Sequence, residues 1–200
     1  MYSQNNEEQI IENYFKGAIG TFLDLGMNDG ITLSNSYALA LKGWQGVGVE
    51  ASPEASDRAQ KLHKDKIQVI NTAVWTYNGE IVLHQSGEHL FKGDISLLST
   101  VIESEKTRWV KEDFNPVTVR CVNFVTLLEL CKYKTFDFIS MDIEGAELVV
   151  LSQMDLKALG CRLLCVEYNG IDQMKYDAII IPQGYKLIHK NGENLIYESV

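Results

Sequence analysis

The stretch Thr21-Phe-Leu-Asp-Leu-Gly-Met-Asn-Asp-Gly30 decides how the rest of the sequence is interpreted. Its first five residues predict a short apolar strand, and Gly26 and Gly30 permit a tight turn directly after it. A strand that breaks into such a turn and then a helical pattern is typical of the first βα unit of a doubly wound sheet. Ligands bind at the carboxyl ends of the strands in these sheets.

Strand and helix patterns alternate outward from this stretch. A helix is predicted around Ile10–Phe15, and a second from Leu33 to Leu41, ended by Lys42 and Gly43. A third helix begins after the N-cap Ser52, with Ala55, Ala59 and Leu62 on its apolar face. A fourth is predicted at Thr126–Cys131. A fifth follows Gly145, with Leu148, Leu151 and Met154 on its apolar face. Strands are predicted at Gly46–Glu50, Ile67–Val74, Ile81–His84, Val117–Asn123, Phe136–Met141 and Arg162–Glu167. The alternation predicts an α/β fold with a mostly parallel central sheet and helices on both faces.

The C-terminal end has a different pattern. The segments Tyr185–His189 and Asn194–Tyr197 flank Lys190-Asn-Gly-Glu193. Asn-Gly between two strand-like runs is a strong signal for a β-hairpin. The last strand is therefore expected to be antiparallel.

Residues 1–200 are expected to form a single domain, because the chain has no linker, repeat or low-complexity segment. Residues 86 to about 116 interrupt the regular alternation with a polar stretch of no sustained period. Long irregular segments of this kind are often functional. This insertion is either a lid over an acceptor site or a surface excursion with one short helix.

Composition disfavours several classes of function. The net charge is −9 and no cluster of Lys and Arg relieves it, so nucleic acid is a poor candidate partner. The polar N-terminus does not resemble a signal peptide, and no apolar run approaches the roughly 20 residues that span a bilayer. The four cysteines contain no C-x-x-C pair, which favours reduced thiols over a zinc site. A cytoplasmic location is expected.

Two acids at strand ends indicate the ligand. Asp24 suits the amino group of a methionine-like ligand, and Glu50 ends the next strand, where an acid commonly pairs with ribose hydroxyls. A dinucleotide site favours Gly-x-Gly-x-x-Gly around a pyrophosphate. Here Asn28 replaces the second glycine and Asp29 adds a charge that repels phosphate. S-adenosylmethionine, which carries no phosphate, fits better than NAD.

A second acidic block, Ser140-Met-Asp-Ile-Glu-Gly-Ala-Glu147, lies at another strand-to-helix junction. Its carboxylates are expected in the same cleft as Gly26 and Glu50. Asp142 is at the strand tip, while Glu144 and Glu147 are three residues apart and could share a helix face. The alternative is that the two glutamates only stabilise the helix N-terminus.

These segments resemble the FkbM family of methyltransferases. The resemblance rests on residues 24–30, on Gly43-Trp44 before the strand ending in Glu50, and on Asp142-Ile-Glu-Gly-Ala-Glu147. It covers nearly the whole chain, with Met27 as one departure where the family often has a small residue. It implies a Rossmann-like class I methyltransferase fold, S-adenosylmethionine as donor, and O-methylation of sugars, glycans or other secondary metabolites. The antiparallel final strand also suits this fold better than a dehydrogenase.

The resemblance also implies which residues bind the cofactor. The methionine portion would be held by Asp24, Gly26, Asn28 and Gly30. Glu50 would hold the ribose, and the Thr72–Ala73 region would face the adenine. Asp142 would line the floor where donor and acceptor meet.

A hydroxyl acceptor needs a base to take its proton. Asp142 or Glu144 is the preferred candidate, with His84 and His89 as outside candidates. A metal-assisted variant stays open, because Asp142, Glu167 and Asn169 could offer oxygen ligands to Mg²⁺ in an arrangement similar to that of catechol-type O-methyltransferases.

Other functions are not eliminated by the sequence. The chain lacks the adjacent prolines of amino-methylating enzymes and the Pro-Cys pair of cytosine C5 enzymes, which favours an oxygen acceptor. The expected partner is a small-molecule or glycan acceptor. A cofactor-binding or interaction module without transferase activity remains an alternative, as does an NAD-dependent dehydrogenase.

Overall fold

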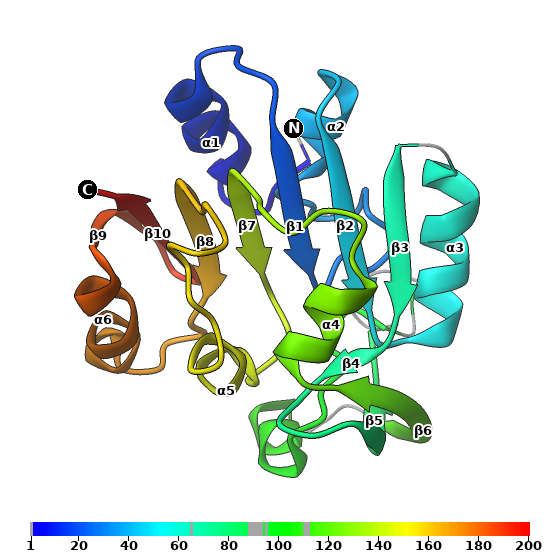
Figure 1. The fold of residues 1–200 in the computed structure, drawn as a ribbon. Helices are drawn as coiled ribbons and strands as arrows, with labels where there is room; N and C mark the ends of the chain where they lie inside the picture. The colour runs from blue at the N-terminus through cyan, green and yellow to red at the C-terminus, as the bar shows by residue number, and fades with distance from the viewer. Residues whose placement is uncertain (1, 65, 88–93, 95, 110–112) are drawn as a thin grey trace.

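The computed structural model describes residues 2–64, 66–87, 94, 96–109 and 113–200. Their strands form two sheets, a seven-stranded sheet of order β3-β2-β1-β7-β8-β10-β9 and a three-stranded sheet of order β4-β6-β5 (Figure 1). The larger sheet consists of β1 (Thr21–Leu25), β2 (Gln45–Glu50), β3 (Ile67–Asn71), β7 (Phe138–Met141), β8 (Leu163–Glu167), β9 (Tyr185–Lys190) and β10 (Asn194–Ser199).

The pairing in the larger sheet confirms the predicted fold class. Strands β3, β2, β1, β7 and β8 are mutually parallel, and β10 pairs antiparallel with both β8 and β9. The carboxyl ends of the parallel strands therefore meet at one edge of the sheet. This edge is where a doubly wound fold binds its ligand.

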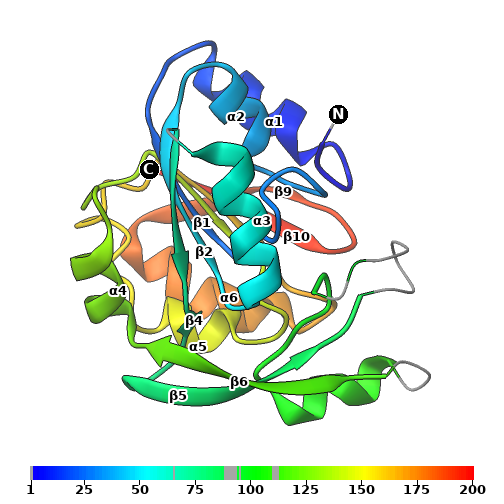
Figure 2. The ribbon, with the colours of Figure 1, turned by 90° about the vertical axis from the view of Figure 1, so that its right-hand side faces the viewer.

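Helices cover both faces of the larger sheet, as Figure 2 shows. One face carries α1 (Glu7–Phe15), α2 (Tyr37–Leu41) and α3 (Pro53–His63), and the other carries α4 (Phe124–Leu130), α5 (Glu147–Leu151) and α6 (Gln173–Ile180), which is followed by the 3₁₀ helix η2 (Ile181–Gln183). On the first face Phe15 packs edge-on against Trp44. On the second, Leu127, Val150 and Tyr176 belong to a larger apolar cluster. The helices thus bury an apolar stripe of side chains against the sheet.

The smaller sheet lies below the carboxyl edge of the larger one in Figure 1. It consists of β4 (Ala73–Val74), β5 (Gly79–Gln85) and β6 (Asn115–Val122). The prediction of one strand over residues 67–74 was wrong, because the chain changes sheets at Thr72. The Thr72 N–H donates to the Glu50 carbonyl at 3.1 Å, while its hydroxyl contacts the Arg120 carbonyl at 3.2 Å. This residue therefore joins the two sheets.

Several predicted helix details were also wrong. Leu33 lies outside α2 with φ of 54°, because the Ser34 hydroxyl accepts from the Tyr37 N–H at 3.0 Å and the helix begins there. Leu41 and Leu62 are 53% and 56% exposed rather than buried. Helix α4 begins two residues earlier than predicted, since the Asn123 side chain caps it.

The described part of the irregular segment adjoins the smaller sheet. Thr100 forms an isolated antiparallel bridge with His84, and the 3₁₀ helix η1 (Glu103–Trp109) follows. The base candidate His89 lies outside the described residues. Across the described part of the chain, no helix has the length and apolar character needed to cross a membrane.

Candidate active site

A cavity of about 300 Å³ lies at the carboxyl edge of the larger sheet. Its walls come from the ends of β1, β2, β7 and β8, from the start of the smaller sheet, and from residues 96–99 and 101. Six of its described lining residues are acids and only one is basic: Asp24, Glu50, Asp142, Glu144, Glu167 and Glu193 against Arg108. The cavity therefore favours ligands with positive charge or many hydroxyl groups.

Gly26 allows the loops after β1 and β7 to approach each other. Its φ is +83°, and a Cβ atom placed on it would lie 1.7 Å from the carbonyl oxygen of Asp142. The Asp142 N–H in turn donates to the Leu25 carbonyl at 2.9 Å. Only glycine fits between these two backbones.

The Gly26→Ala substitution is expected to lower the free energy of unfolding by about 3 kcal/mol or more, because the Asp142 backbone must move. Gly17→Ala is the matched control: its φ is +81° but no heavy atom lies within 4 Å of the added Cβ. The control should lose only the left-handed penalty of about 1–2 kcal/mol. Urea unfolding of both variants measures the difference, and equal losses would contradict the close contact.

Asp24 is buried at the end of β1. The Ser36 hydroxyl donates to its Oδ2 at 2.5 Å. Burial raises the pKa of Asp24 to about 6, although the Ser36 hydrogen bond opposes the shift. Asp24 lines the cavity, and its Oδ1 is not bonded to Ser36.

Glu50 is buried at the end of β2, and both of its oxygens are held by backbone. The Asn28 N–H donates to Oε2 at 2.8 Å and the Ser52 N–H to Oε1 at 2.7 Å. Burial raises the pKa of Glu50 to about 7, and these two N–H groups limit the rise. Each carboxylate oxygen has more than one acceptor position, so the group can still receive two adjacent hydroxyls.

The structure does not place all the predicted cofactor residues in the cavity wall. Asn28 and Ala73 line it. Gly30 is absent from the described lining, and a Cβ on it would lie 2.6 Å from His63 Nε2. Met27 lines the cavity but also fills the space over Gly48, where a Cβ would lie 1.9 Å from its sulfur.

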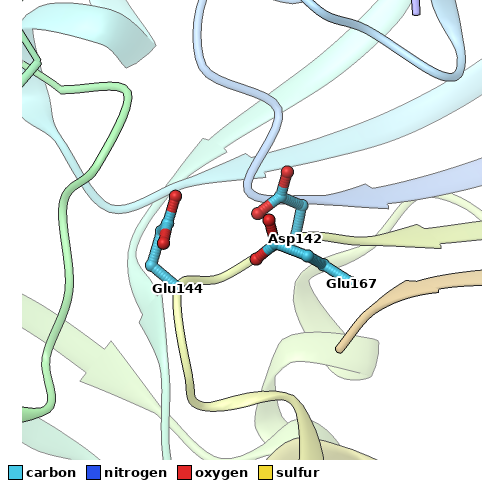
Figure 3. A group of neighbouring side chains, drawn as sticks. All are labelled: Asp142, Glu144 and Glu167. Carbon is cyan, nitrogen blue, oxygen red and sulfur yellow. The ribbon is translucent and has the colours of Figure 1, made fainter. Parts of the chain in front are cut away.

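Three carboxyl groups converge at the ends of β7 and β8. Ligand oxygens of Asp142, Glu144 and Glu167 lie within 4.8 Å of one another. Figure 3 shows the carboxyl groups of Asp142 and Glu167 side by side, with Glu144 set apart on the loop that leaves β7. Asp142 and Glu144 line the same cavity as Gly26 and Glu50, as expected, whereas Glu147, also expected there, is not among the described residues of the cavity wall.

Glu144 and Glu147 do not share a helix face, which corrects the prediction. Glu144 has φ of +51° before the helix, and α5 begins at Glu147. The Glu147 carboxylate turns back to accept from the Ile143 N–H at 2.9 Å and the Gly145 N–H at 3.0 Å. Glu147 therefore shapes the loop that presents Glu144 to the cavity.

Burial and mutual repulsion control the charges of the trio. Burial raises the pKa of Asp142, Glu144 and Glu167, and the Asp142 carboxylate adds to the rise at the other two. Asp142 and Glu167 are hydrogen-bonded to each other, which lowers the pKa of Asp142 and raises that of Glu167. Burial raises the pKa of both groups, so the pair binds a proton more readily than two separate exposed carboxyl groups would.

Several residues that line the cavity were not predicted from the sequence as site residues. Arg108 in η1 lines the cavity and pairs with Glu105 at 2.9 Å. Gln4 and Glu193 also line it, and the Asn5 amide donates to Glu193 at 2.5 Å across 188 residues of sequence. Contacts at such a separation have no local sequence signal.

Backbone strain is concentrated at the cavity. Four non-glycine lining residues have left-handed φ angles: Asn28 (49°), Leu33 (54°), Glu144 (51°) and Asn169 (47°). Such conformations cost on the order of 1–3 kcal/mol each and cluster at functional sites. The observation supports assigning function to this cavity.

The sequence and the fold are both similar to those of known methyltransferases. The family model described as the methyltransferase FkbM domain matches residues 24–183. Methyltransferase FkbM from Methylobacillus flagellatus superposes with a TM-score of 0.54 at 13% identity, covering 90% of this chain and 43% of that one. A TehB-like SAM-dependent methyltransferase from Corynebacterium glutamicum superposes with a TM-score of 0.51 at 10% identity, covering 100% of this chain and 89% of that one. An O-methyltransferase from Bacillus cereus in complex with SAH superposes with a TM-score of 0.50 at 12% identity, covering 97% of this chain and 80% of that one.

The solved structures show a shared fold at these identities. No curated protein matches the sequence. The chain spans less than half the length of the Methylobacillus flagellatus structure.

Proposed function

Because the chain belongs to the FkbM methyltransferase family, we propose that it transfers a methyl group from S-adenosylmethionine to a hydroxyl oxygen of a sugar, glycan or other small acceptor. The family match confirms the resemblance inferred from the sequence motifs. The observation that carries the proposal is that Glu50 and Asp142, which end the strands on either side of β1, line one cavity.

Several residues of the cavity wall fit the donor. Glu50 has acceptor positions for the two ribose hydroxyls, and Asp24 suits an amino group. Ala73, Leu83 and Leu98 provide an apolar wall for the adenine. S-adenosylmethionine supplies, when bound, a methyl group on a positively charged sulfonium, and the surrounding carboxylates favour that charge.

Asp142 is the proposed general base. In this proposal the proton that Asp142 and Glu167 share stays on Glu167, so the Asp142 carboxylate keeps lone pairs to accept the acceptor's hydroxyl proton. As the proton moves to Asp142, the acceptor oxygen bonds to the methyl carbon and the carbon–sulfur bond breaks. Glu144 is the second candidate. His84 is absent from the described cavity wall and pairs with Glu103 at 2.9 Å.

The cavity wall also suits a hydroxyl-rich acceptor. Amide and carboxyl groups of Gln4, Asn35, Asn169 and Glu193 line it. The amides both donate to and accept from hydroxyls and the carboxylate accepts from them, which is what a sugar requires. This composition supports a glycan or other polyol over an apolar acceptor.

A metal-assisted variant is the alternative mechanism. Asp142, Glu144 and Glu167 are hard oxygen donors that fit Mg²⁺ by type and spacing. A cation there would orient the hydroxyl and lower its pKa. Arg108 already brings a positive charge to the same cavity and lowers the pKa of Asp142 and Glu144. Assays with added Mg²⁺ and with a chelator distinguish the two mechanisms.

Calorimetric titration with S-adenosylhomocysteine tests the donor site, and an acceptor screen tests the transfer. One-to-one binding followed by methylation of a hydroxyl compound is expected. Binding without transfer across a broad panel would support a cofactor-binding module instead. Binding of NAD but not of S-adenosylhomocysteine would support a dehydrogenase.

The affinity for S-adenosylhomocysteine should decrease as the pH falls. Glu50 accepts ribose hydroxyls best when ionised, and its pKa is raised to about 7. Its ionised fraction falls about tenfold from pH 8 to pH 6, and the pKa of Asp24 near 6 adds to the loss. Calorimetry at pH 6, 7 and 8 should show a dissociation constant more than about tenfold higher at pH 6 than at pH 8. An unchanged constant would contradict the role of Glu50.

A further inference from the structure

Residues 96–99 form a wall of the cavity next to the proposed cofactor end. Asp94 shapes the start of this wall, because its Oδ1 accepts from the Ser96 N–H at 2.8 Å and the Leu97 N–H at 3.0 Å. Gly87 lies directly beneath, where a Cβ would be 2.8 Å from Asp94 Oδ1. The wall is therefore a defined turn seated on the chain that leaves β5.

Arg58 connects this wall to helix α3. Its Nη2 lies 3.2 Å from Asp94 Oδ2, 3.3 Å from Ser96 Oγ and 3.4 Å from Asn28 Oδ1. The Asp94 side chain is 11% exposed and that of Arg58 39%. We call Arg58, Asp94, Ser96 and Asn28 the latch, because they link three separate segments through one guanidinium nitrogen.

The latch reaches the carboxylate assigned to the ribose. Asn28 accepts from the Ser96 hydroxyl at 3.1 Å through Oδ1 and donates its backbone N–H to Glu50 at 2.8 Å. The negative charge of Asp94 raises the pKa of Glu50, and Arg58 pairs with that charge. A change at Arg58 is therefore transmitted to Glu50 by both geometry and charge.

The wall has other attachments besides the latch. The Leu98 N–H donates to the Ser86 carbonyl at 2.9 Å, and Thr100 exchanges backbone hydrogen bonds with His84. Loss of the Arg58 guanidinium should therefore loosen the wall against Glu50 without unfolding it. Within the described residues, Asn28 Nδ2 and Arg58 Nε are buried without partners, so the latch is not fully satisfied as it stands.

We propose that Arg58 is a positioning residue of the cofactor site, which acts through Asp94 and Asn28 to hold the wall of residues 96–99 against Glu50 and so slows cofactor release. The inference rests on the proposed function. It assigns Arg58 no contact with the cofactor and no part in the transfer step.

The test is stopped-flow measurement of S-adenosylhomocysteine association and dissociation. Arg58→Met and Asp94→Asn should each raise the dissociation rate about tenfold and change the association rate less than threefold. The double variant should be no worse than either single variant, because both remove one linkage. Arg58→Lys should restore part of the slow release, since an ammonium can still pair with Asp94. Arg120→Met, on the exposed face of β6, is the control.

The outcomes separate this inference from the proposed function. If the unmodified protein does not bind S-adenosylhomocysteine, the proposed function is wrong and the latch has no cofactor to hold. If it binds but Arg58→Met releases it at the normal rate, the latch is wrong and the function stands. A slower association together with a lowered melting temperature, and no faster release, would show a purely structural role and would also overturn the latch.

Discussion

Glu50→Gln is expected to weaken S-adenosylhomocysteine binding at least about a hundredfold. In the proposed site two ribose hydroxyls donate to the ionised carboxylate, and hydrogen bonds to a charged group contribute about 1.5–3 kcal/mol each. The Asn28 and Ser52 N–H groups each donate to a separate oxygen of Glu50, and the amide of glutamine offers only one acceptor oxygen for both. Calorimetric titration at pH 8 measures the loss.

Glu129→Gln provides the matched control for Glu50, because it makes the same change on an exposed residue of α4. Thermal unfolding of both variants separates lost binding from lost folding. If Glu50→Gln remains folded and binds within threefold of the unmodified protein, the ribose is held elsewhere.

Asp142→Asn is expected to lower the rate of methyl transfer about 10²–10⁴-fold, the usual contribution of a general base. The amide cannot take the hydroxyl proton, although its size and its contact with Glu167 are retained. Binding of S-adenosylhomocysteine should change less than tenfold, because the proposed site holds the donor chiefly at Glu50 and Asp24. Product formation is followed by mass spectrometry with an acceptor found by the screen.

Asp113→Asn, an exposed acid just before β6, is the control for Asp142. The comparison with Glu144→Gln is equally informative. Full activity in Asp142→Asn with a large loss in Glu144→Gln would move the base to Glu144. Unchanged activity in both variants would exclude Asp142 and Glu144 as the base.

The sequence predicted the larger sheet because each of its strands carries a local signal. Apolar runs end in glycine or in an acid, and parallel strands bring their carboxyl ends to one edge. That rule alone placed Asp24, Glu50 and Asp142 together. The Asn-Gly turn signal likewise predicted the final antiparallel hairpin.

Other features depend on contacts distant in sequence. The chain leaves the larger sheet at Thr72 because Ala73 pairs with Cys121, almost fifty residues later. Leu62 fits an apolar stripe with Ala59, yet α3 buries His63 instead, one position further round the helix. Arg108 enters the cavity from a 3₁₀ helix within a segment that has no regular period.

The excess of acids in the cavity has a consequence for turnover. The donor carries a sulfonium charge before methyl transfer, and the product that remains in its place is an uncharged thioether. Burial raises the pKa of five of the six acids in the described cavity wall, and in the proposed reaction those that are ionised stabilise the charged donor more than the uncharged spent cofactor. The same carboxylates that attract the donor thus favour departure of the product and reduce inhibition by it.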